Sequence, residues 1–224
     1  HMKPAAGDFR IFWDNAYAVH DLYDEGDTLL NIYNECVKAG SPDLPIIFTS
    51  TSKITFPGAG VAVEAASPNN VALLKGRMKY QTIGPDKLNQ LRHARMFRTV
   101  SDIEKHMKRH AAILRPKFET VEKELQKQLG DTGVARWTTP KGGYFISLYV
   151  LEGCAKRVEQ LCANAGMILT PAGATYPYGT DPKDSNIRIA PSYPSVEEIE
   201  KASEVLALAV RYAALEKLLS DKEN

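Results

Sequence analysis

The sequence has no long apolar run and almost no net charge, and each absence excludes a class of protein. No stretch approaches the roughly 20 consecutive apolar residues that a membrane-spanning helix requires. The formal net charge is +1, so there is no electrostatic reason to expect nucleic acid or an anionic membrane as a partner. We therefore expect a protein that binds neither nucleic acid nor a membrane.

Cysteine is scarce and follows no binding pattern. The three cysteines, Cys36, Cys154 and Cys162, form no CxxC pair and match no metal-binding spacing. This odd, scattered set indicates reduced thiols in a cytoplasmic protein, so we expect small core residues and no bound metal. The first residues, 1–4, lack the apolar core of a signal peptide and resemble a cloning remnant.

The first part of the chain alternates strand-like runs with turns. With 224 residues, 44% of them hydrophobic, the sequence is long enough for one large domain or two small ones. Apolar runs at residues 8–13, 44–49 and 60–66 predict three strands. Residues 28–39 could form a short helix or an irregular crossover, whereas residues 70–75 and 85–97 have helical character.

A long amphipathic helix marks the change to the second part. Ser101 and Glu104 match a capping box, and Gly130 is expected to end the helix. One apolar stripe follows a period of about 3.6 residues, and it comprises Ile103, Met107, Ala111, Leu114, Phe118, Val121 and Leu125.

The remaining residues alternate short strands and helices. We expect strands at 135–138, 144–150, 167–170 and 186–190, a helix at 155–164, and a last helix that ends near Leu219. Ser195 and Glu198 form a second capping box at the start of that last helix. The pattern is typical of an α+β layer domain, and we place the domains at 1–95 and 96–224.

Polar residues follow the first two strand-like runs. Ser50-Thr51-Ser52-Lys53 comes directly after the second run, and Asp14 closes the first, with Tyr17 three residues later. A lysine at a strand end is, taken alone, most often a solvated charge. Together, however, these residue types are what pyridoxal-phosphate (PLP) chemistry requires: an amine to hold the cofactor, a carboxylate for the ring nitrogen, a phenol for the ring oxygen, and hydroxyls for the phosphate. Adjacent strand ends of an open α/β sheet bring such groups to one edge.

In this order, the motifs resemble those of the class I/II (fold type I) PLP-dependent aminotransferases, in which an Asp-x-Ala-Tyr strand end precedes a Ser-x-Ser-Lys strand end. The resemblance implies that Lys53 is the lysine that binds PLP, that Asp14 faces the pyridine nitrogen, and that Tyr17 is the phenol at the ring oxygen. It also implies that Ser50 is a phosphate ligand, assisted by Ser52.

Later motifs extend the resemblance over essentially the whole chain. Residues 140–145 (PKGGYF) are similar to the Gly-Gly-aromatic hairpin of the family's small domain. Residues 186–190 (NIRIA) are similar to the strand whose arginine binds the substrate α-carboxylate, which implies that role for Arg188, with its forked guanidinium. The runs 14–20, 49–61 and 83–90 resemble bacterial type Ic aspartate aminotransferases in particular.

The resemblance implies an α/β fold: the C-terminal part of the PLP-dependent transferase large domain, with strands of a mostly parallel sheet, followed by a small α+β domain. It implies transamination between an L-amino acid, aspartate, and a 2-oxo acid, 2-oxoglutarate, in a longer homodimeric parent enzyme, so that the isolated chain would be inactive. One position departs from the family pattern. The arginine that binds the cofactor phosphate, eight residues after the lysine, is replaced by Val61.

Other interpretations stay open. The same scaffold supports lyases, decarboxylases and the effector domains of transcriptional regulators, and the isolated chain could be a structural fragment. Four histidines invite metal-binding or acid–base roles: His20, His93, His106 and His110. His106 and His110 are one helical turn apart, but no third ligand is in view, so we expect a solvated helix face there.

Overall fold

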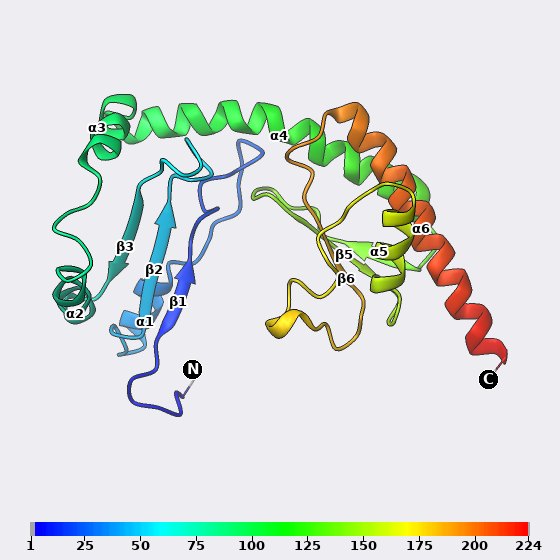
Figure 1. Ribbon diagram of the computed structural model, residues 1–224, viewed down its shortest axis with the longest axis horizontal. Helices are drawn as coiled ribbons and strands as arrows, with labels where there is room; N and C mark the ends of the chain where they lie inside the picture. Colours follow the sequence, from blue (N-terminus) through cyan, green and yellow to red (C-terminus); the bar gives the residue numbers. More distant parts are fainter. Residues whose placement is uncertain (1–2, 224) are drawn as a thin grey trace. The chain divides into compact units, whose positions relative to one another are not determined.

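The structure, a computed structural model, describes residues 3–223, and they fall into two compact units (Figure 1). The first unit runs to Val19 and continues from Asp27 to Lys108; the second comprises His20–Gly26 and the chain from Arg109 onward. The domain boundary between residues 95 and 96 stays a prediction about the parent protein.

The first unit contains a three-stranded sheet with the order β1-β2-β3. Its strands are β1 (Ile11–Asp14), β2 (Pro45–Ser50) and β3 (Ala62–Ala66). Strands β1 and β2 are parallel, and β3 runs antiparallel to β2, as the arrows in Figure 1 show. All three predicted strands are confirmed.

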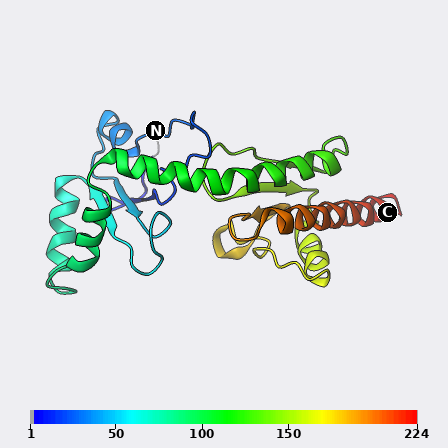
Figure 2. The same cartoon turned by 90° about the horizontal axis from the view of Figure 1, so that it is seen from above.

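Helices connect and follow these strands. They are α1 (Ile32–Lys38), α2 (Pro68–Met78), α3 (Lys87–Met96) and the first residues of α4 (Val100–Leu129), the long green helix in Figure 2. Each of the first three begins at a polar N-cap: the side chains of Asn31, Ser67 and Asp86 accept hydrogen bonds from backbone N–H groups of the first turn. The crossover between β1 and β2 therefore contains a real, short helix.

The start of α4 corrects one prediction. The reciprocal capping box is formed by Thr99 and Asp102, not by Ser101 and Glu104: Asp102 accepts the Thr99 N–H at 2.9 Å, and the Asp102 N–H donates to Thr99 Oγ1 at 3.3 Å. Asp102 takes the place that glutamate has in the usual capping box: its side chain accepts the Thr99 N–H, and its own N–H donates to the Thr99 hydroxyl. The second box is confirmed, since the Ser195 N–H donates to Glu198 at 2.8 Å and the Glu198 N–H to Ser195 Oγ at 3.2 Å.

The second unit contains an antiparallel sheet with the order β4-β5-β6 and two further α-helices. Its elements are β4 (Ala135–Trp137), β5 (Ile146–Val150), α5 (Ala155–Asn164), the 3₁₀ turn η1 (Pro177–Gly179), β6 (Asn186–Ile189) and α6 (Val196–Glu223). The predicted strand at residues 167–170 is wrong. The Met167 N–H donates to the Cys162 carbonyl instead, in the turn that closes α5 at Gly166 (φ +84°), so it is unavailable to a sheet.

The two units differ in how much apolar surface they bury. In the second, the later part of the predicted stripe of α4, from Leu114 to Leu125, packs with the sheet and α6, and Phe118, Leu125, Leu148 and Leu206 are at most 1% exposed. The first unit leaves large apolar side chains open, including Phe12, which is 74% exposed. None of the described helices combines the length and the apolar character needed to cross a membrane.

Candidate active site

The carboxyl ends of β1 and β2 lie side by side at one edge of the first sheet. In the parallel register Asp14 is opposite Phe48, and the Asn15 N–H donates to the Phe48 carbonyl at 2.7 Å. The Thr49 hydroxyl donates to the Asn15 carbonyl at 3.4 Å. The strand ends that carry Asp14 and Ser50 are therefore neighbours, as the sequence predicts for an open α/β sheet.

The end of β1 is shaped by Asp14 itself. One oxygen of its exposed carboxylate accepts the Ala16 N–H at 3.0 Å, which closes a tight turn directly after the strand. Tyr17 lies in that turn and is half-buried. The local geometry therefore holds the carboxylate and the phenol on one short segment at the sheet edge.

Lys53 lies in the middle of a helical turn that follows β2. We call residues 51–55 the Lys53 turn. The N–H groups of Ile54 and Thr55 both donate to the Thr51 carbonyl, at 2.9 and 2.8 Å. The Lys53 side chain is exposed, while Ile54 beside it is buried and anchors the turn.

Two serine hydroxyls lie together at the start of this turn. Ser50 Oγ and Ser52 Oγ are 3.1 Å apart, and the Ser52 N–H points at Ser50 Oγ from 3.4 Å. Both side chains are half-buried. Paired hydroxyls beside a backbone N–H are suitable donors for an anionic group such as a phosphate.

The loop after the Lys53 turn folds back onto it. The Thr51 N–H donates to the Val61 carbonyl, and the Val61 N–H donates to Thr51 Oγ1, both at 2.9 Å. A Cβ added to Gly60 would lie 3.1 Å from both the Ser52 nitrogen and Thr51 Oγ1, so this close approach favours glycine. Val61 thus contributes its backbone to holding the turn, at the position where the family pattern has an arginine.

Arg188 lies in the second unit, on β6 opposite Ser147 of β5. Its guanidinium lies over the Phe145 ring at 4.6 Å from the ring centre. Its Nε is buried and has no hydrogen-bond partner among the described residues. A buried donor of a charged group is costly to leave unsatisfied, so this arginine is suited to an acceptor from outside the chain.

A family comparison identifies the scaffold that carries these groups. The model of a family described as aspartate amino-transferase matches residues 1–222. The chain belongs to the aspartate aminotransferase family.

Individual relatives agree. The chain is 48% identical over 215 residues to the aspartate aminotransferase of Corynebacterium glutamicum, covering 96% of this chain and 50% of that protein. The crystal structure of an aspartate transaminase from the same species superimposes with a TM-score of 0.93 at 48% identity, over 96% of this chain and 51% of that one. The chain spans about half the length of the curated relatives it matches, which agrees with the predicted C-terminal half.

A more distant structure supports the fold alone. LysN, an α-aminoadipate aminotransferase from Thermus thermophilus solved with N-(5'-phosphopyridoxyl)-L-leucine, has a TM-score of 0.73 at 21% identity, over 92% of this chain and 51% of that one. The fold class is therefore confirmed as that of the PLP-dependent transferases.

The strand that carries Arg188 is organised by a buried carboxylate. Asp181 accepts the N–H groups of Ser185 at 2.8 Å, Asn186 at 2.9 Å and Lys183 at 2.9 Å. Burial raises the pKa of Asp181, but these hydrogen bonds together outweigh burial and bring the pKa below its ordinary value. Asp181 thereby fixes where β6 begins, two residues before Arg188.

The need for glycine in the Gly-Gly hairpin is explained by residues 20–22, which pack against it although no sequence pattern indicated this contact. The Gly143 N–H donates to the His20 carbonyl at 2.8 Å, and the Leu22 N–H donates to the Lys141 carbonyl at 2.8 Å. A Cβ on Gly142 would lie 2.9 Å from the His20 carbonyl oxygen. Residues 20–26 therefore belong to the second unit, although they are only a few residues past Tyr17.

Sequence reasoning also missed two residues that contact the Lys53 turn. His93 of α3 lies within hydrogen-bond distance of Thr51 and Thr55, and His106 of α4 lies 2.7 Å from the Ile54 carbonyl. No motif joins these histidines to Lys53, because the contacts span about 40 to 50 residues of chain. Within the described residues no cluster suited to a metal ion occurs.

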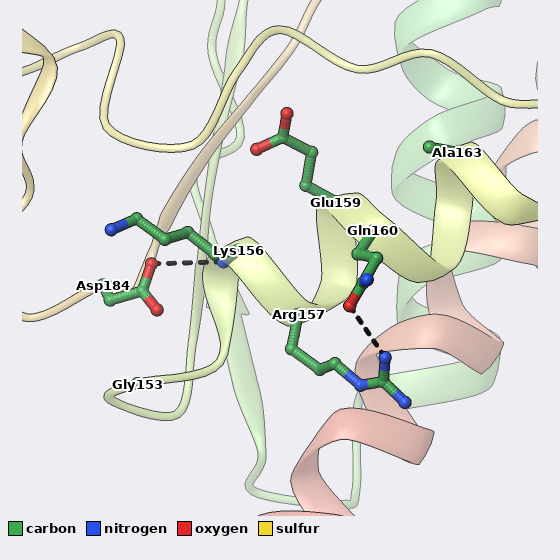
Figure 3. Close-up of a pocket in the computed structure, with 7 residues that line it drawn as sticks. All are labelled: Gly153, Lys156, Arg157, Glu159, Gln160, Ala163 and Asp184. Atoms are coloured by element: carbon green, nitrogen blue, oxygen red, sulfur yellow. Dashed lines mark hydrogen bonds between the residues drawn. The ribbon is translucent and has the colours of Figure 1, made fainter.

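Polar residues that line a pocket in the second unit form hydrogen bonds within the fold (Figure 3). Asp184 accepts the Lys156 N–H at 3.1 Å, and Arg157 donates to Gln160 at 2.9 Å. Glu159 accepts the N–H of Ala172 at 2.7 Å. We therefore place no active-site function there.

Proposed function

We propose that the full-length protein containing this chain is a PLP-dependent aminotransferase. It would transfer an amino group between an L-amino acid and a 2-oxo acid, with aspartate and 2-oxoglutarate as the favoured pair. The observation that carries the proposal is the edge of the first sheet, where Lys53, Asp14 and Tyr17 follow two adjacent parallel strands. The named aspartate aminotransferase relatives support the choice of substrates.

The donor set at that edge fits PLP. Lys53 would hold the cofactor covalently, Asp14 would face the pyridine nitrogen, and Tyr17 would lie at the ring oxygen. The hydroxyls of Ser50 and Ser52, 3.1 Å apart, would bind phosphate oxygens. When bound, PLP supplies an electron sink that stabilises negative charge at the substrate α-carbon.

Each side chain then has a separate task. The amine of Lys53, which is exposed on its turn, would serve both to hold the cofactor and to move a proton at the substrate α-carbon. The Asp14 carboxylate would hold a proton on the ring nitrogen through charge pairing. The Tyr17 hydroxyl would donate a hydrogen bond to the ring oxygen.

Arg188 would orient the substrate. Its half-buried guanidinium has a buried Nε without an acceptor in the described chain, and a carboxylate supplies two acceptor oxygens in the geometry of the guanidinium fork. The Phe145 ring, whose centre is 4.6 Å from the guanidinium carbon, helps to hold the fork in place. We propose that the α-carboxylate of the amino acid occupies this position.

The parent would act as a cytoplasmic homodimer, and the isolated chain would be inactive, because half the length of the relatives is not represented in it. The test is a titration of the full-length protein with PLP, followed at about 420 nm, where the lysine-bound cofactor absorbs. An aspartate and 2-oxoglutarate assay should then show turnover. If PLP binds but no amino-acid pair is turned over, another activity of the same scaffold, a lyase or decarboxylase, replaces the proposal.

A further inference from the structure

The Lys53 turn is contacted from two helices by two histidine rings. His93 lies near the end of α3 and is half-buried. Its Nε2 is 2.9 Å from Thr51 Oγ1 and 2.8 Å from Thr55 Oγ1, and these residues are the first and last of the turn. A single imidazole nitrogen therefore bridges both ends of the segment that carries Lys53.

The ring of His93 is fixed from its other side. Its Nδ1 lies 2.7 Å from the Asn89 carbonyl, one turn earlier in the same helix. A carbonyl oxygen can only accept, so Nδ1 carries the hydrogen and donates it. The Thr51 hydroxyl can donate its hydrogen to an unprotonated Nε2, and the oxygens of both threonine hydroxyls can accept from a protonated one. The contact between the ring and the turn is therefore available in either protonation state, through Thr51 alone or through both threonines.

The threonines pass this restraint into the backbone. Thr51 Oγ1 also accepts the Val61 N–H at 2.9 Å, and Thr55 Oγ1 donates to the Thr51 carbonyl at 3.1 Å. From α4, His106 Nε2 donates to the Ile54 carbonyl at 2.7 Å. The backbone on both sides of Lys53 is thereby tied to α3, to α4 and to the loop after the turn.

We infer that His93 is a positioning residue that holds the Lys53 turn in the conformation in which the lysine meets its cofactor. The inference rests on the proposed function of Lys53 and adds a residue that touches neither cofactor nor substrate. Lysine has a long, mobile side chain, so the placement of its amine depends on how firmly its backbone is held.

The first test uses the full-length protein and needs no cofactor. Hydrogen exchange of the Ile54 and Thr55 amides is measured in the wild type and in His93→Phe, which keeps a ring but removes the bridge. Loss of the bridge should speed exchange of both amides by about tenfold. Arg95→Phe is the matched control: it places the same ring on the same helix about 200° around the axis, on an exposed position, and should leave both rates unchanged.

The second test uses the full-length protein. His93→Phe should lower the yield of borohydride-trapped PLP on Lys53 and reduce kcat by about tenfold with little change in KM. His93→Gln, whose amide can still bridge the two hydroxyls, should recover part of both. Unchanged exchange at Ile54 and Thr55 would overturn the bridge. Faster exchange with an unchanged Lys53 adduct and kcat would overturn the positioning role.

The two tests also separate this inference from the proposed function. If the wild-type protein traps no cofactor on Lys53, the proposed function fails, and with it the cofactor-positioning role, whatever His93 does. The exchange measurement would still decide whether the His93 bridge exists.

Discussion

Arg188 is charged, half-buried and short of one hydrogen bond, and this combination is informative at the scale of a single residue. Its Nε has no acceptor within the described chain, while the Phe145 ring covers one face of the guanidinium. The sequence predicted Arg188 from its strand motif, but it could not show the missing acceptor. For His93 only the structure is informative, because its contacts with Thr51 and Thr55 are not predictable from the spacing of these residues in the sequence.

The first prediction concerns Arg188→Lys in the full-length protein. Lysine keeps the charge and loses the two-pronged geometry, which should cost about 1–3 kcal/mol of substrate binding and leave PLP affinity unchanged. Arg136→Lys is a suitable control, because Arg136 also stacks on an aromatic ring, that of Tyr149 at 4.0 Å, in the same sheet. Steady-state KM values and PLP titrations measure both effects. A loss of PLP affinity with unchanged KM would assign Arg188 to the cofactor instead.

At the scale of helices and strands, the most reliable predictions came from sequence patterns that extend over only a few residues. The Ser195 and Glu198 box, the apolar stripe of α4 and the helix at 155–164 are all present, because caps and periodicity act over a few residues. The errors have equally local causes. Asp102 rather than Glu104 closes the box at Thr99, and the Met167 amide is used in the cap of α5.

The second prediction concerns the start of β6. Asp181→Asn replaces a carboxylate that accepts three N–H groups, which should lower the free energy of unfolding of the second unit by about 1–3 kcal/mol. Denaturant unfolding at neutral pH measures it. Asp131→Asn, at an exposed carboxylate, should have little effect.

A comparison of the wild type with Asp181→Asn also tests how stability depends on pH. The pKa of Asp181 is lowered in the folded protein, since its hydrogen bonds outweigh the opposing effect of burial. Its stabilisation is therefore fully present above the unfolded-state pKa of about 3.9 and is lost as the pH falls from there through the lower folded-state pKa. Wild type and Asp181→Asn should therefore differ in stability at pH 7, and the difference should shrink as the pH is lowered below the unfolded-state pKa. A difference that stays the same as the pH is lowered would show that Asp181 does not contribute through its charge.

At the scale of the whole molecule, the two units differ in how complete they are. The second has a continuous buried core, to which Leu22 is added from the N-terminal part of the chain. The first exposes Phe12 and Val63 on its strands. The sequence predicted the family and the order of elements, but it could not predict that residues 20–26 join the second unit, because that depends on contacts with Lys141 and Gly143 more than 100 residues away.

The third prediction follows from this difference. In the isolated chain, hydrogen exchange should be slow in the second unit and fast in the sheet of the first, and the Leu22 amide should exchange slowly with the second unit. The open sheet should cause self-association, which Phe12→Lys should reduce. Sedimentation measures the association. A chain that is monomeric with uniformly slow amides would contradict this account.

The central claim is that Lys53 holds the cofactor, and one measurement tests it most directly. The full-length protein is incubated with PLP, reduced with borohydride and digested, and the modified lysine is identified by mass spectrometry. The account predicts a single adduct on Lys53, absent from Lys53→Ala although that variant unfolds like the wild type. An adduct on Lys75 or Lys87 instead, or one that persists in Lys53→Ala, would contradict it.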